Sequence, residues 1–235
     1  MNVQLRAYGF IVATALFATL AFQAAQAATL SEGQAAYGMH DYRGAFAKWE
    51  DLADKGNPRA LNNLGILYQN GRGVPRDYGM AMRLYRKAAA KGNAEAENNI
   101  GVLYDAGLGV QKDYTEAAKW YRQSADDGFA EAQYNIGVLY HTGQGVKRDE
   151  AQAAQWFHKA AEQGDPRAQF NSGILYRAGR GGPKDNAKAY MWLSLAAEAG
   201  DKNAKRSLNA LSGSMTEEQR DEGRGMAEAW QKRKG

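Results

Sequence analysis

The stretch "NIGVLYDAGLGV" at residues 99–110 returns almost letter for letter as "NIGVLYHTGQGV" at residues 135–146. Each copy places a glycine inside an apolar run and then closes with Gly-x-Gly. Such a glycine pair belongs either to a loop that cradles phosphate or to a structural unit that the chain repeats. The sequence on both sides of the two copies decides between these interpretations.

The unit recurs with a period of 36 residues, in four blocks at residues 59–94, 95–130, 131–166 and 167–202. A glycine, a tyrosine and an aspartate hold the same three positions in every block. These are Gly65, Gly101, Gly137 and Gly173; Tyr68, Tyr104, Tyr140 and Tyr176; and Asp77, Asp113, Asp149 and Asp185. The agreement indicates a repeat protein.

Each block reads as two helices. In the first block, apolar residues recur at helical spacing from Ala60 to Tyr68 and again from Ala81 to Ala89, with "QNGRGVPRD" between them. A lone helical hairpin cannot cover its own apolar stripe, but stacked copies can. The sequence therefore predicts an all-α fold, an α-solenoid. The aspartate that precedes each second helix is expected to cap it.

The two kinds of glycine have different expected roles. A glycine inside a helix costs about 1 kcal/mol relative to alanine, so the recurring Gly101 and Gly137 predict close approach of a neighbouring helix. The Gly-x-Gly pairs lie between helices and are expected to adopt left-handed backbone angles. A phosphate loop needs a preceding strand, which the pattern does not provide. We expect Gly145→Ala to be milder than Gly101→Leu.

The repeated pattern A-x-x-N-x-G-x-L-Y-x-x-G-x-G-V-x-x-D-x-x-x-A-x-x-W-Y-x-x-A-A-x-x-G resembles the Sel1-like repeat, which is related to the tetratricopeptide repeat. Leu84, Ser124 and Gly182 depart from it in single blocks. The resemblance implies a right-handed superhelix of antiparallel helical hairpins. It also implies a role in protein–protein interaction, with a protein or peptide as partner.

The segments outside the four repeats also have expected structures. Residues 28–58 resemble a tetratricopeptide hairpin with a shortened loop, and Ser31 with Gln34 forms a candidate capping box at its start. Residues 203–235 are expected to form capping helices and a basic tail, with Thr216 and Gln219 as a second capping box. Such caps keep the ends of a solenoid soluble.

Residues 1–27 read as a signal peptide. Arg6 is followed by an apolar run, and Ala25-Gln26-Ala27 fits the small-x-small rule for cleavage after Ala27. An uncleaved anchor is the alternative interpretation. Cleavage predicts an exported bacterial protein, periplasmic or secreted, with no stable membrane span in the mature chain.

The composition argues against several classes of function. The chain has no cysteine, which excludes disulfides and thiol chemistry, and its net charge of +4 is mild. The C-terminal "QKRKG" is the only compact basic patch, so no nucleic-acid partner is expected. The three histidines, His40, His141 and His158, do not lie at metal-binding spacing, so no metal or cofactor is expected.

The sequence does not predict an enzyme. Members of a cysteine-rich subgroup of Sel1-like proteins are linked to β-lactam hydrolysis. This chain lacks those cysteines and also lacks Ser-x-x-Lys. A cell-envelope hydrolase acting on peptidoglycan or β-lactam substrates is kept as the alternative. The five tryptophans are expected in the core.

A partner is expected on the concave face, which the first helix of each hairpin lines. The side of that helix opposite its apolar stripe carries two positions that vary between blocks. These predicted protein-binding residues are Asn62, Asn98, Tyr134 and Phe170 at one position, and Gln69, Asp105, His141 and Arg177 at the other. Tyr134 and Phe170 would be aromatic anchors. The alternative is that both rings fill gaps between hairpins.

Overall fold

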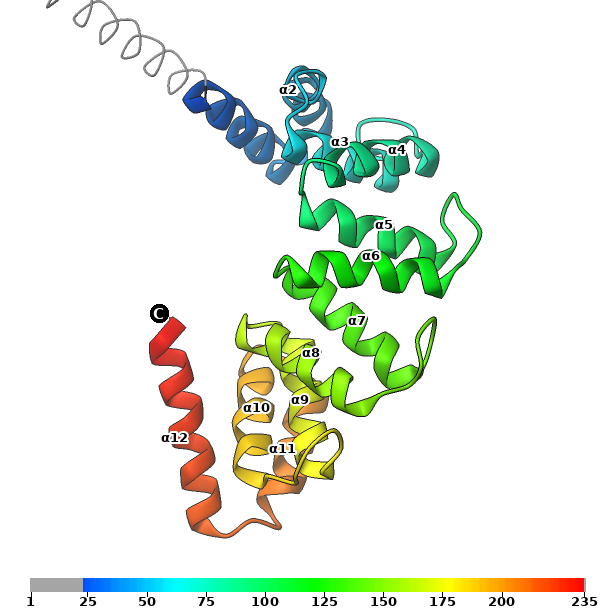
Figure 1. Cartoon of the computed structure of the whole chain (residues 1–235). Helices are drawn as coiled ribbons and strands as arrows, with labels where there is room; N and C mark the ends of the chain where they lie inside the picture. The colour runs from blue at the N-terminus through cyan, green and yellow to red at the C-terminus, as the bar shows by residue number, and fades with distance from the viewer. Residues whose placement is uncertain (1–22, 235) are drawn as a thin grey trace, which may run out of the picture. The chain divides into compact units, whose positions relative to one another are not determined.

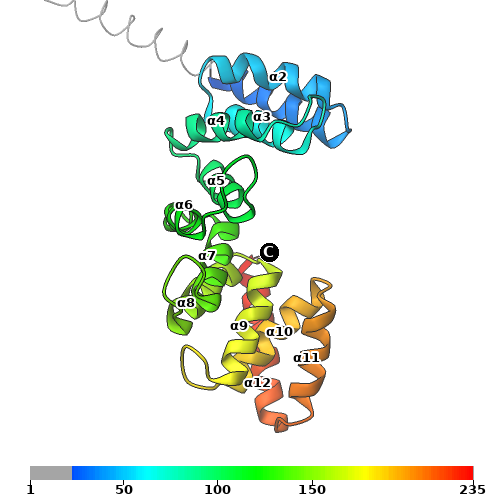
Figure 2. The ribbon, with the colours of Figure 1, turned by 90° about the vertical axis from the view of Figure 1, so that its right-hand side faces the viewer.

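The structure, a computed structural model, describes residues 23–234, which contain helices and no strand. The chain divides into two compact units with the boundary after Ala96. The expected all-α solenoid is confirmed, because consecutive helices in each unit pack as hairpins (Figures 1 and 2).

The first unit holds two hairpins. Residues 23–38 are helical and are followed, after a short loop, by α2 (Tyr42–Asp54); α3 (Pro58–Asn70) and α4 (Tyr78–Ala89) form the second hairpin. In α2, Ala45, Trp49 and Leu52 are buried.

The expected capping box at Ser31 is wrong. Ser31 lies inside the helix at 23–38, because the alanine-rich segment before it is itself helical and Thr29 donates to the carbonyl of Ala25 at 3.0 Å. Residues 1–22, most of the expected signal peptide, lie outside the described residues.

The second unit holds the remaining hairpins and the C-terminal helices. Its helices are α5 (Ala94–Ala106), which begins at the boundary, α6 (Tyr114–Asp126), α7 (Ala130–Thr142), α8 (Glu150–Glu162), α9 (Pro166–Ala178), α10 (Asn186–Glu198), α11 (Lys202–Ser212) and α12 (Glu217–Lys234).

The repeated aspartate caps each second helix, as predicted. Asp113 Oδ1 accepts from the backbone N–H groups of Thr115 at 2.8 Å and Glu116 at 3.1 Å. Asp77, Asp149 and Asp185 make the same kind of bond at α4, α8 and α10. A side-chain acceptor here pairs N–H groups that have no partner inside the helix.

The helical glycines lie where the two helices of one hairpin approach closely, as predicted. A Cβ at Gly101 would lie 2.6 Å from Cδ1 of Tyr121, and one at Gly137 would lie 2.9 Å from Cδ1 of Phe157. A real Cβ does not fit at such distances. Any larger residue would therefore push the second helix away from the first.

The Gly-x-Gly turns have left-handed backbones, with φ values of +74° at Gly143 and +68° at Gly145. The second glycine has a further role that the sequence pattern did not indicate. A Cβ at Gly145 would overlap the carbonyl of Tyr114, and one at Gly181 would overlap that of Glu150. The loop of one hairpin therefore packs on the start of the second helix of the hairpin before it.

Four of the five tryptophans are buried, as expected: Trp49, Trp156, Trp192 and Trp230. Trp120 differs, because it keeps part of its surface exposed.

The C-terminal helices cover the last repeat. Thr216 and Gln219 form the predicted capping box, with two reciprocal bonds of 3.3 Å. Helix α12 lies along α10 (Figure 1), and α11 packs against α10 (Figure 2). The ring of Trp230 meets that of Trp192 edge-on at 6.2 Å, and its Nε1 donates to Glu162 at 3.2 Å.

Candidate protein-binding surface

The first of the two predicted binding positions is not accessible in the first two repeats. Asn62 and Asn98 are each only 1% exposed, so their prediction as surface residues is wrong. The Oδ1 of Asn98 accepts from Nδ2 of Asn135 at 2.9 Å, which places the next first helix over this side of α5. The hydrogen bond satisfies a polar group that burial would otherwise penalise.

Tyr134 and Phe170, at the same position in the third and fourth repeats, are partly buried among apolar side chains. The ring of Tyr134 lies 5.7 Å from that of Phe157, and the guanidinium of Arg167 lies 4.3 Å above it. Phe170 packs against the cluster that contains Leu193 and Leu211. Both rings therefore fill space between helices, and their role as anchors for a partner stays a prediction.

In the first two repeats, the residue at the second predicted position bonds to the second helix of its own hairpin. The hydroxyl of Tyr85 donates to Oε1 of Gln69 at 2.8 Å, and the hydroxyl of Tyr121 donates to Oδ2 of Asp105 at 3.3 Å. Burial is the main cause that raises the pKa of both tyrosines. In these repeats the position is occupied by an internal hydrogen bond.

The last two repeats lose this bond, because Phe157 and Leu193 replace the tyrosines and carry no hydroxyl. His141 instead pairs with Glu150, with 2.9 Å between Nδ1 and Oε2. Burial favours the neutral form of Glu150, but hydrogen bonds from Arg148 and His141 outweigh it and lower the pKa of this carboxyl. Arg177 lies in the last turn of α9 and is partly exposed.

The eight predicted residues are divided between the two units. Asn62 and Gln69 belong to the first unit, and Asn98 is internal. At the second position within the second unit, Asp105 bonds to Tyr121, His141 pairs with Glu150, and Arg177 is partly exposed.

A buried carboxylate also distinguishes the second repeat. Glu97 is 1% exposed, and its Oε1 accepts from Nε2 of Gln123 at 2.6 Å. Its Oε2 has no hydrogen-bond partner in the described part of the chain. Burial raises the pKa of Glu97. The equivalent residues Gln133 and Gln169 are neutral and donate to backbone carbonyls.

Sequence reasoning missed a cavity in the fourth repeat. It has a volume of about 310 Å³, and it is lined by α8, α9, the loop after α9 and the first turn of α10. Two signals pointed to it: Gly182, which departs from the repeat pattern, and Ser172, which takes a place that other repeats give to leucine or isoleucine.

Residues 23–234 contain no group of three or more histidine, cysteine, aspartate or glutamate side chains that could hold a metal ion. No helix in this range is both long and apolar enough to cross a membrane.

Comparison with known families identifies the repeat. The Sel1 repeat family matches residues 58–93, 94–129, 130–165 and 166–201, which together exceed half of the chain. The chain belongs to the Sel1 repeat family. The matched boundaries lie one residue before those read from the sequence.

Solved structures agree with this assignment. A Sel1 repeat protein from Oxalobacter formigenes is 36% identical, with 76% of this chain and 74% of that chain covered and a TM-score of 0.69. The protective antigen c5321 of uropathogenic Escherichia coli, which displays an SLR fold, is 30% identical with a TM-score of 0.74. That alignment covers 86% of this chain but 45% of the antigen.

No curated protein matches the chain. Proteins built from Sel1 repeats generally mediate protein–protein interactions and are typically non-catalytic scaffolds.

Proposed function

We propose that this protein is an exported, non-catalytic scaffold that docks a protein or peptide on the face of its hairpins predicted to be concave. One observation supports the proposal most. The helical glycine and the capping aspartate recur in every repeat, while the residue at the second predicted position changes from Gln69 or Asp105, each bonded to a tyrosine of its own hairpin, to His141, which pairs with Glu150, and to the partly exposed Arg177. A scaffold that is constant inside and variable outside suits recognition.

The buried serine that lines a cavity, Ser172, is not set up as a nucleophile, which favours a scaffold over an acyl-transfer enzyme. Ser172 is 3% exposed, and its Oγ has no hydrogen-bond partner among the described residues. A serine nucleophile needs a base within hydrogen-bond reach to take its proton.

Two measurements on the purified protein distinguish the scaffold from the hydrolase alternative. The first is turnover of peptidoglycan and of a chromogenic β-lactam, which should not exceed the rate without protein. The second is crosslinking in envelope extracts through a photoreactive residue at Arg177, which should give a discrete adduct. Turnover of either substrate contradicts the proposal.

Export has its own test. Cell fractionation should place the protein in the periplasm or the medium, and its N-terminal residue should be Ala28. A cytoplasmic protein that retains residues 1–27 would contradict this part of the proposal.

A further inference from the structure

The fourth repeat has lost two aliphatic side chains that the earlier repeats share. Leu64, Ile100 and Ile136 give way to Ser172, and Val74, Val110 and Val146 give way to Gly182. In the third repeat, Ile136 is buried and Val146 packs against the same cluster. The two changes therefore remove neighbouring apolar volume from one repeat.

The space they leave is the cavity of about 310 Å³, which we call the Ser172 cavity. Its lining includes His158, Ser172, Leu175, Arg180, Gly182 and Lys188. Ser172 and Leu175 belong to the buried interior of the hairpin. A hollow at the equivalent place in the third repeat is wider, about 470 Å³, but none of its lining residues is buried. Of these two hollows, the Ser172 cavity is the one lined by buried side chains.

Ser172 is the unusual group in this cavity. Its side chain is 3% exposed, and its Oγ makes no hydrogen bond to any described residue. Buried hydroxyls almost always have a partner, because leaving one unpaired is costly. Ser172 is also one of the residues that line the cavity, so a ligand that enters lies next to it, and a small shift of the cavity wall would let that ligand supply the missing bond.

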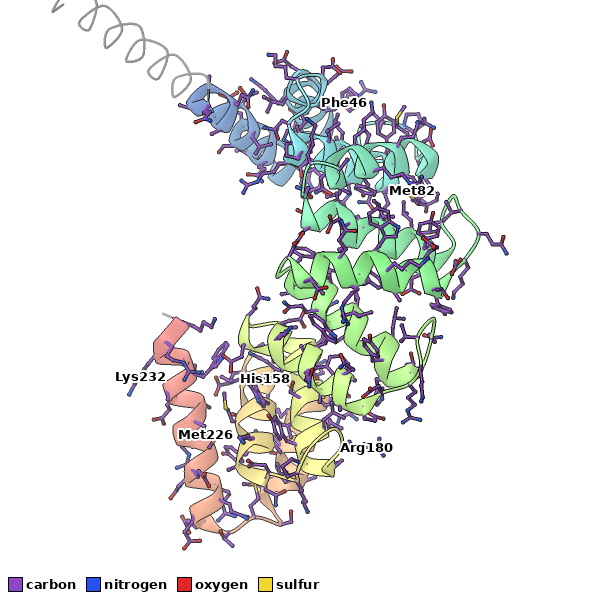
Figure 3. All side chains as sticks on the ribbon, viewed as in Figure 1. Phe46, Met82, His158, Arg180, Met226 and Lys232 are labelled. Atoms are coloured by element: carbon purple, nitrogen blue, oxygen red, sulfur yellow. The ribbon has the colours of Figure 1, made fainter. Side chains whose placement is uncertain are left out.

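The rim of the Ser172 cavity carries two cationic side chains, Arg180 and Lys188. Arg180 comes from the loop after α9 and His158 from α8 (Figure 3), and Lys188 comes from α10. Lys188 forms an ion pair with Asp185, with 3.1 Å between Nζ and Oδ2. Among the described residues, the guanidinium of Arg180 forms no ion pair. No acidic side chain lines the cavity. The rim therefore favours a ligand with negative charge.

We propose that the Ser172 cavity binds an acidic peptide segment that inserts one uncharged side chain. The apolar stem of that side chain replaces the aliphatic volume lost at Ser172 and Gly182, and its polar end bonds to the Ser172 hydroxyl. Carboxylates on either side of it pair with Arg180 and Lys188 at the rim. This inference rests on the proposed scaffold function and names the kind of partner.

The test uses fluorescein-labelled peptides and fluorescence anisotropy with the purified full chain. The peptides alternate aspartate and glycine and differ only in the central residue, which is glutamine or alanine; a third peptide has lysine in place of every aspartate. The glutamine peptide should bind roughly tenfold more tightly than the alanine peptide, as expected for one recovered hydrogen bond. The lysine peptide should not bind.

The decisive variant is Ser172→Ile with Gly182→Val, which restores the side chains of the third repeat. It should raise the melting temperature, because it fills the cavity, and should abolish binding of the glutamine peptide. Gly225→Ala is the matched control, since an added Cβ there meets no neighbour within 4 Å. It should leave binding unchanged.

Binding of the glutamine peptide that survives the double variant overturns the inference, and so does failure of that peptide to bind the unmodified chain. Neither result bears on the scaffold function, which stands or falls on the turnover and crosslinking measurements.

Discussion

The ring of Tyr121 lies against Gly101, where a Cβ would sit 2.6 Å from Cδ1, and its hydroxyl reaches Asp105, one helical turn further along α5. Because Gly101 has no side chain, the ring of Tyr121 can lie across α5, and its hydroxyl then holds Asp105. One side chain thus sets the spacing of the two helices and also bonds to a residue that was predicted to bind a partner.

This contact predicts that Gly101→Ala destabilises the protein although alanine favours helices. The propensity gain of about 1 kcal/mol is opposed by overpacking, which typically costs about 1–3 kcal/mol. Urea unfolding followed by circular dichroism measures the difference. Gly225→Ala, in α12, has open space around its Cβ and should be stabilising. If both variants shift stability in the same direction, close packing is not the reason for the glycine.

Gly145→Ala should be strongly destabilising, for a reason that the repeat pattern alone did not indicate. Its φ of +68° costs a non-glycine residue about 1–2 kcal/mol, and its Cβ would also overlap the carbonyl of Tyr114. Gly143→Ala is the control, because it has φ of +74° but its Cβ would meet only the Arg148 residue beside it in the loop. Thermal unfolding should show the larger loss for Gly145→Ala. Equal losses would mean that the loop does not depend on the preceding hairpin.

Glu97→Gln should stabilise the protein at neutral pH. Because burial raises the pKa of Glu97 in the folded state, the unfolded chain releases this proton at lower pH than the folded one. Stability is full below the unfolded pKa of about 4.3 and is lost as pH rises through the folded pKa. Unfolding free energies measured from pH 4 to pH 7 should therefore diverge, with the variant more stable at pH 7 and similar near pH 4.

The reciprocal change, Gln133→Glu, places a carboxyl at the equivalent position of the third repeat. It removes the bond from Nε2 to the carbonyl of Ala125 and should destabilise increasingly as pH rises. A pH-independent effect of both variants would show that neither site favours the protonated carboxyl.

Phe170→Ala and Arg177→Ala separate packing from binding. Phe170 lies in the cluster with Leu193 and Leu211, so its truncation should cost about 3 kcal/mol of stability, the low end for a phenylalanine in a core. Arg177 is partly exposed, and its truncation should change stability by no more than about 0.5 kcal/mol. Partner capture at a temperature where both variants are folded should fall for Arg177→Ala. A stable Phe170→Ala variant that loses binding would restore Phe170 as an anchor.

The features that recur in every repeat were predicted correctly from the sequence. The exposure of a side chain was predicted wrongly where it depends on how neighbouring helices pack. The column of Gly101 predicted a close approach, and the column of Asp113 predicted a cap, because both depend on local geometry. The exposure of Asn98 was inferred from one helix alone, opposite its own apolar stripe. In a stack that side is covered by the next first helix, and Asn135 bonds there. To predict the Ser172 cavity, one needs the repeat pattern, which shows the departures at Ser172 and Gly182, and also the packing of the helices, which brings these two residues to the same cavity.

The separation between each helical glycine and its partner has a consequence for how the chain folds. Gly101 and Tyr121 are twenty residues apart, as are Gly137 and Phe157. Contacts this local carry a small loop-closure cost, so proteins dominated by them fold quickly. Each hairpin can therefore act as its own nucleus, and a growing polypeptide can add finished hairpins one after another before its C-terminal helices exist.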